Sequence, residues 1–314
     1  MALFEKTKQS IPSNLLVNKF GWPPFSILNT ISWDWQRRKD EWESLGIYST
    51  DGRDVKRYNA TPTNTFSSRG IEAKAAESVS TFDPFLCELM YKWFSIKGMK
   101  ILDPFSGGSV RGIVASVLGR DYLGIDLSKA QVDANTIQFG NLYESYSDIE
   151  GTCDWIVGDS AEVLQTLPTD FDMVFTCPPY YNLEKYSADI RDLSNLPTYE
   201  DFIFKYSEIL VSSAEKIKAN SFFVIVVSEI RNETVTEHSE YLGFVPDTIH
   251  ILKDICGLKY YNEIILENNI GSLPMRAPKY FNKSRKIGRH HQNILVFYKG
   301  NLSAIKDKFG EVIP

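Results

Sequence analysis

The sequence has few residues of the kinds that cross-link small folds or bind metals. Its 314 residues include only four cysteines, which are far apart and form no CxxC pair: Cys87, Cys153, Cys177 and Cys256. We therefore expect free thiols in a reducing compartment, rather than a disulfide framework or a zinc site. The four histidines show no spacing typical of a metal site or a catalytic triad, so we expect no metal ion.

Long hydrophobic segments are lacking as well. The longest apolar run, Phe222 to Val227, is far shorter than the roughly 20 residues that a membrane-spanning helix needs. Residues 4–10 are mostly polar and Pro12 interrupts the next stretch, unlike a secretion signal. These absences predict a cytoplasmic protein that has no membrane partner.

A general excess of positive charge is also absent. The chain carries 34 Lys and Arg against 40 Asp and Glu, a net charge of −6, which argues against a protein coated with positive charge. The segment 270–293, however, contains no acid and six basic residues: Arg276, Lys279, Lys283, Arg285, Lys286 and Arg289. Taking these six charges out leaves −12 for the rest of the chain. We predict a stiff basic loop here, which is either a solvated surface segment or the contact for one anionic partner.

Residues 1–80 differ in composition from the rest of the chain. They hold four of the six tryptophans: Trp22, Trp33, Trp35 and Trp42. The stretch 50–70 is polar, has no apolar period and predicts a loop. We predict an aromatic-rich N-terminal extension over 1–80 and a main domain over 81–314. The extension would pack against the main domain, or would contact nucleic acid or a second copy of the chain through its basic run Arg37–Lys39.

From residue 81 onward, strand patterns alternate with helix patterns. Apolar runs that predict strands occur seven times, at 99–105, 121–127, 154–159, 171–177, 221–230, 260–268 and 292–299. Helix-length segments separate the first five, so we expect right-handed crossovers and a mostly parallel sheet. The last two strands enclose the basic segment and predict an antiparallel hairpin at the C-terminal edge. The expected fold class is therefore α/β, Rossmann-like, with a seven-stranded sheet.

Three acids stand at the ends of the first three predicted strands, where such sheets bind ligands. They are Asp103 in DPFSGGS, Asp126 in GIDLS and Asp159 in VGDS. Gly107 and Gly108 allow a tight turn and a close approach of the backbone to a ligand. Asp126 follows Asp103 by 23 residues, the offset of a carboxylate that binds ribose hydroxyls. An acid within the turn would repel a pyrophosphate, so the pattern favours the cationic S-adenosylmethionine over NAD.

The fourth predicted strand ends in an unusual turn, TCPPYY at 176–181. Proline cannot continue a central strand, because it lacks the amide hydrogen that the strand ladder needs. Two prolines in succession, followed by Tyr180 and Tyr181, predict a rigid extended elbow. This elbow would present a carbonyl oxygen and an aromatic face to a ligand.

Together these residues resemble the DNA methyltransferases that modify amino groups, at N6 of adenine or N4 of cytosine. DPFSGGS at 103–109 is similar to the cofactor turn of that family, and CPPY at 177–180 to its catalytic tetrapeptide. STFDPFLCEL at 80–89 looks like the helix that closes over the methionine end of the cofactor, and WPPFSIL at 22–28 looks like phage-type members. The resemblance covers about 80–300. It implies a Rossmann-like methyltransferase fold, S-adenosylmethionine as cofactor and double-stranded DNA as partner, in a prokaryotic or phage-infected cell.

The resemblance also implies a role for each matching residue. The cofactor would be held by Thr81, Phe82, Asp103, Pro104, Phe105, Ser106, Gly107, Asp126, Leu127, Asp159 and Ser160. The backbone carbonyl of Pro178 and the side chain of Cys177 would accept hydrogen bonds from the target amine, with Pro179 completing the elbow. Tyr180 would stack on a base flipped out of the duplex, and methyl transfer would need no covalent enzyme intermediate. The six basic residues of 270–293 would bind the DNA.

Two residues depart from the family pattern. Ser109 stands where the turn usually ends in glycine, and Cys177 where the tetrapeptide usually begins with Asp, Asn or Ser. A thiol is only a weak acceptor, so the choice between adenine, which we prefer, and cytosine stays open. The nucleophilic cysteine of C5-cytosine enzymes follows a proline, whereas Cys177 precedes two, and we do not expect cysteine catalysis. The alternatives are an RNA or protein amide methyltransferase, and a catalytically weak relative that binds nucleic acid.

Overall fold

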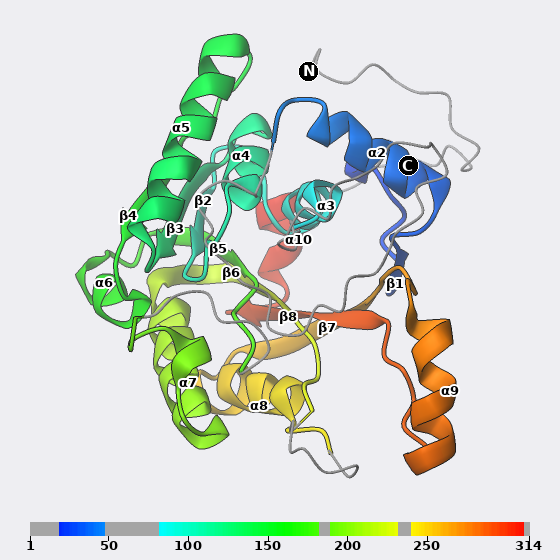
Figure 1. Cartoon of the computed structure of the whole chain (residues 1–314). Helices are drawn as coiled ribbons and strands as arrows, with labels where there is room; N and C mark the ends of the chain where they lie inside the picture. Colours follow the sequence, from blue (N-terminus) through cyan, green and yellow to red (C-terminus); the bar gives the residue numbers. More distant parts are fainter. Residues whose placement is uncertain (1–18, 48–81, 182–188, 232–239, 311–314) are drawn as a thin grey trace.

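The computed structural model describes residues 19–47, 82–181, 189–231 and 240–310, and its centre is one eight-stranded sheet (Figure 1). The strands are β1 (Ile27–Asn29), β2 (Lys100–Asp103), β3 (Asp121–Asp126), β4 (Cys153–Val157), β5 (Phe171–Thr176), β6 (Ile217–Val227), β7 (Lys259–Glu267) and β8 (His291–Lys299). They lie in the order β1-β7-β8-β6-β5-β2-β3-β4. All neighbours are parallel except β8, which is antiparallel to both β6 and β7. The predicted α/β, Rossmann-like fold with an antiparallel C-terminal hairpin is confirmed.

Helices cover both faces of the sheet and give it two cores. The helices are α2 (Trp33–Glu43), α3 (Pro84–Phe94), α4 (Val110–Val117), α5 (Lys129–Ser145), α6 (Ser160–Thr166), α7 (Tyr199–Lys216), α8 (Phe244–His250), α9 (Leu273–Ser284) and α10 (Ala304–Phe309). Figure 1 shows α2 to α5 on one side and α6 to α8 on the other. Strand β6 contributes side chains to both cores, because successive side chains of a strand point to opposite faces of the sheet. Among the described residues, no helix is both long and apolar enough to cross a membrane.

The N-terminal extension contributes an eighth strand that the sequence patterns did not predict. Strand β1 pairs in parallel with β7, with Ile27 opposite Ile265, and so lies outside the C-terminal hairpin. Helix α2 then packs on α3 through two completely buried tryptophans, Trp35 and Trp42. The indole N–H of Trp35 donates to Asp83 (2.9 Å), the residue that caps α3. The described part of the extension is therefore built into the same body as the sheet.

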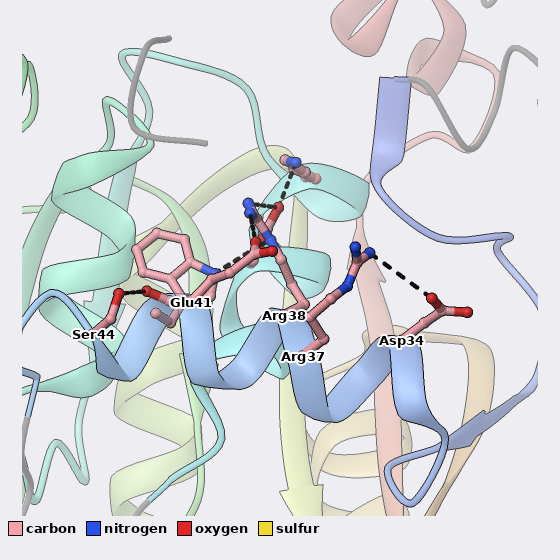
Figure 2. Close-up of polar contacts among 8 residues, drawn as sticks. Asp34, Arg37, Arg38, Glu41 and Ser44 are labelled. Atoms are coloured by element: carbon pink, nitrogen blue, oxygen red, sulfur yellow. Dashed lines mark hydrogen bonds and ion pairs between the residues drawn. The ribbon is translucent and has the colours of Figure 1, made fainter. Parts of the chain in front are cut away.

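Polar contacts between α2 and α3 centre on one buried carboxylate, Glu88, which is only 1% exposed. Its oxygens accept hydrogen bonds from Arg38 (2.8 and 2.9 Å), from the indole of Trp42 (2.6 Å) and from Lys92 (2.6 Å). Figure 2 shows the side chain of Arg38 reaching from α2 toward this group. Each oxygen has at least one donor, so the buried charge is compensated.

The four cysteines are all free in the structure. Cys87 and Cys153 are buried, and burial raises the pKa of both thiols. Cys256 is half-buried, and burial raises its pKa to about 11. These three thiols therefore stay protonated at neutral pH and are poor nucleophiles.

Candidate active site

The carboxyl ends of β2 and β5 are joined by the side chain of Asp103. This carboxylate is completely buried. It accepts hydrogen bonds from Arg111 Nε (2.6 Å), Tyr122 Oη (2.8 Å), Thr176 Oγ1 (2.6 Å) and the backbone N–H of Phe105 (3.2 Å). Thr176 is the last residue of β5, so one carboxylate links the glycine turn to the elbow. We expected an acid that favours a cationic ligand; instead Arg111 neutralises Asp103, whose oxygens are taken up by hydrogen bonds within the protein.

Arg111, on α4, shapes the glycine turn from inside the protein. Its guanidinium donates to the carbonyl oxygens of Phe105 (2.6 Å) and Ser106 (2.9 Å), and lies 4.5 Å from the centre of the Phe82 ring. Burial by itself would lower the pKa of Arg111, but the Asp103 carboxylate outweighs burial and raises it, so the guanidinium stays charged. Its only signal in the sequence is one arginine within a mostly apolar helix pattern, and we did not assign it.

The glycine turn after β2 is pinned to the end of β3. The backbone N–H of Ser106 donates to the carbonyl of Ile125 (3.0 Å), and that of Gly107 to the Asp126 carboxylate (2.9 Å). Gly107 has a φ of 50°, in the left-handed region that favours glycine. A side chain at Gly124 on β3 would begin 2.7 Å from the Cβ of Ser106. Glycines on both sides therefore allow the two strand ends to approach closely.

The other expected cofactor residues gather along the same edge of the sheet. Asp126 also accepts the backbone N–H of Ser128 (2.8 Å). Asp159 caps α6 through the N–H of Ala161 (2.9 Å), and the hydroxyl of Ser160 donates to the carbonyl of Pro104 (2.5 Å). These bonds bring the glycine turn close to the ends of β3 and β4. Leu127 directly follows Asp126 at the end of β3. Thr81 lies outside the described residues.

The elbow after β5 leads into an aromatic cluster. Cys177 and Pro179 are half-buried and Pro178 is buried. The Tyr180 hydroxyl accepts a hydrogen bond from Gln292 Nε2 on β8 (3.2 Å), and its ring packs edge-on against Phe244 at the start of α8 (5.9 Å between ring centres). Both contacts come from segments that are remote in sequence, so no local motif could have indicated them.

One cavity of the protein lies away from these residues. It has a volume of about 350 Å³ and is lined by Phe20, Pro24, Phe25, Ser26, Trp93, Phe94, Asn262, Glu263 and Ile264. None of the expected cofactor or catalytic residues lines it. The strand ends, where the polar groups and glycines converge, remain the candidate active site.

The basic segment forms a helix, which corrects our expectation of a loop. Helix α9 covers Leu273–Ser284, with Pro274 in its first turn and Pro278 inside it. Proline is well accommodated in a first turn, and Pro278 removes only one helical hydrogen bond. No residue of α9 is buried. The cationic side chains therefore stand on an exposed helix that joins β7 to β8.

Arg289 differs from the other basic residues of this segment. Its Nε donates to the hydroxyl of Ser228 (3.0 Å) and to the carbonyl of His291 (3.2 Å), and its terminal nitrogen donates to Asn293. These bonds tie the start of β8 to the end of β6. The guanidinium of Arg289 is thus occupied inside the protein, and we leave Arg289 out of the basic residues that we propose for DNA contact.

Comparison with known proteins finds similarity of fold. No family model matches the chain, and no curated protein sequence matches it. Among solved structures, TrmN from Thermus thermophilus aligns with a TM-score of 0.43 and 13% identity, over 70% of this chain and 50% of its own. A TehB-like SAM-dependent methyltransferase from Corynebacterium glutamicum aligns with a TM-score of 0.37 and 19% identity, over 65% of this chain and 82% of its own.

A third similar structure, also from Thermus thermophilus, is described as a putative DNA modification methylase in complex with S-adenosyl-L-methionine. It aligns with a TM-score of 0.34 and 20% identity, over 46% of this chain and 52% of its own. The chain thus spans about half the length of this protein and of TrmN. At these identities the likeness concerns the fold alone.

Proposed function

We propose that the chain is a DNA methyltransferase that moves the methyl group of S-adenosylmethionine to the exocyclic amine of a flipped base. We favour adenine N6 over cytosine N4. The observation that carries the proposal is the 2.6 Å hydrogen bond from Thr176 to Asp103, because it joins the CPPY elbow to the DPFSGGS turn. A methyl donor held at the turn and an amine held at the elbow would meet at one edge of the sheet.

The residues along this edge suit S-adenosylmethionine, which supplies an activated methyl group when bound. Asp126 is half-buried at a strand end, where its carboxylate can accept hydrogen bonds from ribose hydroxyls. The Ser106 hydroxyl is buried in the turn and has no hydrogen-bond partner in the described part of the chain, so a ligand could satisfy it. We assign further cofactor contacts to Thr81, Phe82, Pro104, Phe105, Gly107, Leu127, Asp159 and Ser160. Asp103 has a positioning role.

The elbow suits an amine that must be made more nucleophilic. The lone pair of an exocyclic amine is delocalised into the base, and an acceptor for its N–H groups draws the lone pair back to nitrogen. The Pro178 carbonyl is one such acceptor, and Cys177 offers only a weak one. Tyr180, fixed by Gln292 and Phe244, presents its ring for stacking on the flipped base.

The basic side chains of helix α9 are suited to contact the phosphates of the DNA backbone. Arg276, Lys279 and Lys283 recur at helical spacing and share one face. On the other side Leu273 and Ala277 are less exposed, and Leu273 packs against Gly288 of the returning chain, where a Cβ would stand 2.5 Å from it. The cationic face therefore points away from the body, where it can meet phosphates. Arg285 and Lys286, just beyond the helix, extend this basic surface.

The test of the proposal is tritiated S-adenosylmethionine offered with duplex DNA, tRNA and total protein as separate acceptors. We expect label in DNA. Tyr180→Ala should slow that transfer by about fivefold or more, because stacking on one base contributes about 1–3 kcal/mol. Tyr143→Ala, which changes a tyrosine exposed on α5, is the control and should keep the wild-type rate. Label only in RNA or protein would refute the DNA proposal, and label in none would favour a binding role without catalysis.

A further inference from the structure

Glu229 lies just beyond the carboxyl end of β6, the strand that neighbours β5 and its elbow. Strands β5 and β6 pair in parallel up to Thr176 and Ile225, so the two segments leave the sheet side by side. Tyr180 and Glu229 each stand four residues beyond this last pair. Both residues also contact the start of α8: Tyr180 meets the ring of Phe244, and Glu229 Oε1 accepts the backbone N–H of Val245 (3.0 Å).

The position of Glu229 is fixed from several directions. The carbonyl of Ile230 accepts the N–H of Leu242 (2.9 Å), and the hydroxyl of Ser228 accepts a hydrogen bond from Arg289 (3.0 Å). The chain is thus held through the side chain of Ser228 and the backbone of Ile230, and the Val245 contact holds one carboxylate oxygen. The other oxygen, Oε2, is buried and has no hydrogen-bond partner in the part of the chain that the structure describes.

A buried carboxylate oxygen without a donor is unfavourable, and such a group in a native protein calls for an explanation. The contrast within this chain is Glu88, whose two oxygens are both occupied. Glu229 is also near the aromatic cluster that follows the elbow, since its charge acts on Tyr199. Burial raises the pKa of Tyr199, and the charges of Asp247 and Glu229 raise it further, while the ring of Tyr199 packs on Tyr181 (5.7 Å).

We propose that Glu229 accepts the second N–H of the target amine, a role for which the Cys177 thiol is poorly suited. This inference rests on the proposed function. The amine donates one N–H to the Pro178 carbonyl and the other to Glu229 Oε2. Its lone pair forms the bond to the methyl carbon, the bond from that carbon to sulfur breaks, and the electron pair stays on sulfur. The methylated nitrogen then loses its proton to Glu229, which returns it to water.

The experiment compares wild type with Glu229→Gln in methyl transfer to long, unmethylated duplex DNA of mixed sequence. Gln keeps a carbonyl oxygen for Val245 but replaces the unpartnered oxygen by an N–H₂ group, which cannot accept. We expect transfer to slow about a hundredfold, with unchanged affinities for S-adenosylmethionine and for DNA. The thermal midpoint should be unchanged or higher, because the substitution removes a carboxylate oxygen that has no donor among the described residues. A purely structural role would lower the midpoint and spare the rate.

Glu88→Gln is the matched control, because it changes a buried glutamate whose oxygens all have donors. It should lower the thermal midpoint and leave transfer per folded molecule unchanged. A Glu229→Gln rate within threefold of wild type would overturn the inference, whereas a wild type that labels no DNA would refute the proposed function itself. If Glu229→Gln does not fold, Glu229→Asp is the second variant. It keeps the carboxyl group but moves it back by one methylene. We then expect at least a tenfold loss of rate, and an unchanged rate would again reject Glu229 as the acceptor.

Discussion

Helices α2 and α9 both carry clusters of basic residues, and they use them in opposite ways. On α2, every member of the basic run 37–39 has an acidic partner within the protein, and Figure 2 shows Arg37 directed toward Asp34. Arg37 lies 3.8 Å from Asp34, Lys39 lies 3.6 Å from Glu43, and Arg38 is bonded to the buried Glu88. The apolar face of α2 is also used, since Trp35 and Trp42 are completely buried.

Helix α9 differs from α2, since no residue of it is buried. The segment 270–293 contains no acid, and within the described residues Arg276, Lys279 and Arg285 form no salt bridge. Large apolar side chains remain exposed, with Met275 at 78% and Tyr280 at 50%. A basic residue count alone would rank the two helices alike. Pairing and burial separate a helix that holds the fold together from one that is available to a partner, and they make α9 the better candidate for DNA contact.

The largest effect that separates the two helices should come from Glu88→Ala. The substitution leaves Arg38, Lys92 and Trp42 without their shared acceptor, and breaking a buried ion pair in this way costs about 3–5 kcal/mol. We expect the low end of that range, because Arg38 and Lys92 keep side-chain exposures of 19% and 27%. Denaturant unfolding followed by circular dichroism measures the change.

The comparison for this prediction is an alanine substitution on α9, such as Lys279→Ala. Surface changes of this kind usually alter stability by less than about 0.5 kcal/mol. If Glu88→Ala were equally harmless, α2 would be attached to the fold mainly by its tryptophans, and its basic run would again be a candidate for contact with a partner.

Regular periodicity made most of this fold predictable from sequence. The apolar runs at 99–105 and 221–230 correspond to β2 and β6, and the helix-length segments between strands fixed the parallel crossovers. Strand β1 was missed because three residues are too short to show an alternation. Helix α9 was missed because Pro274 and Pro278 resemble loop signals, although one stands in the first turn and the other removes a single hydrogen bond.

Only those parts of the candidate site that lie within short sequence motifs were predictable. The turn at 103–109 and the elbow at 177–180 were found because each carries its geometry in adjacent residues. The pairing of Asp103 with Arg111 was not, because an arginine within a helix pattern gives no sign of the carboxylate that it will meet. Glu229 was missed for the same reason, since its distinguishing feature is an oxygen with no donor in the described part of the chain, which only packing reveals.

Removal of the α9 charges should weaken DNA binding in a salt-dependent way. If Arg276, Lys279 and Arg285 each meet a phosphate, replacing all three by alanine flattens the log–log dependence of affinity on salt by about 2.7 units. The measurement is fluorescence anisotropy of a labelled duplex over a range of salt concentrations. The matched control replaces Arg37 and Lys39 by alanine, and we expect it to keep the wild-type slope because both side chains are paired with acids. The opposite pattern would assign DNA binding to α2.

A smaller effect should separate Arg289 from its neighbours in the same basic segment. Arg289→Met removes the hydrogen bonds that the guanidinium makes to Ser228 and to the start of β8, and we expect a loss of about 1–2 kcal/mol in the free energy of unfolding. The salt slope should stay within about half a unit of wild type, because no phosphate contact is lost. A flatter slope with unchanged stability would return Arg289 to the DNA-contacting set.

The smallest expected effect is the pH dependence of the Glu88 contribution. Burial pushes the pKa of Glu88 up, but Lys92 and Arg38 outweigh it, so the folded-state pKa lies below its ordinary value. The folded protein therefore binds this proton less tightly than the unfolded chain, whose glutamate titrates near about 4.3. The stabilisation is present above that pH and is lost as pH falls through the folded-state pKa. Glu88→Gln has no such proton, so its deficit in unfolding free energy relative to wild type should shrink as pH falls from about 6 to about 3. A deficit that stays constant over this range would mean that the α2–α3 contact depends on hydrogen bonding and shape, with little contribution from charge.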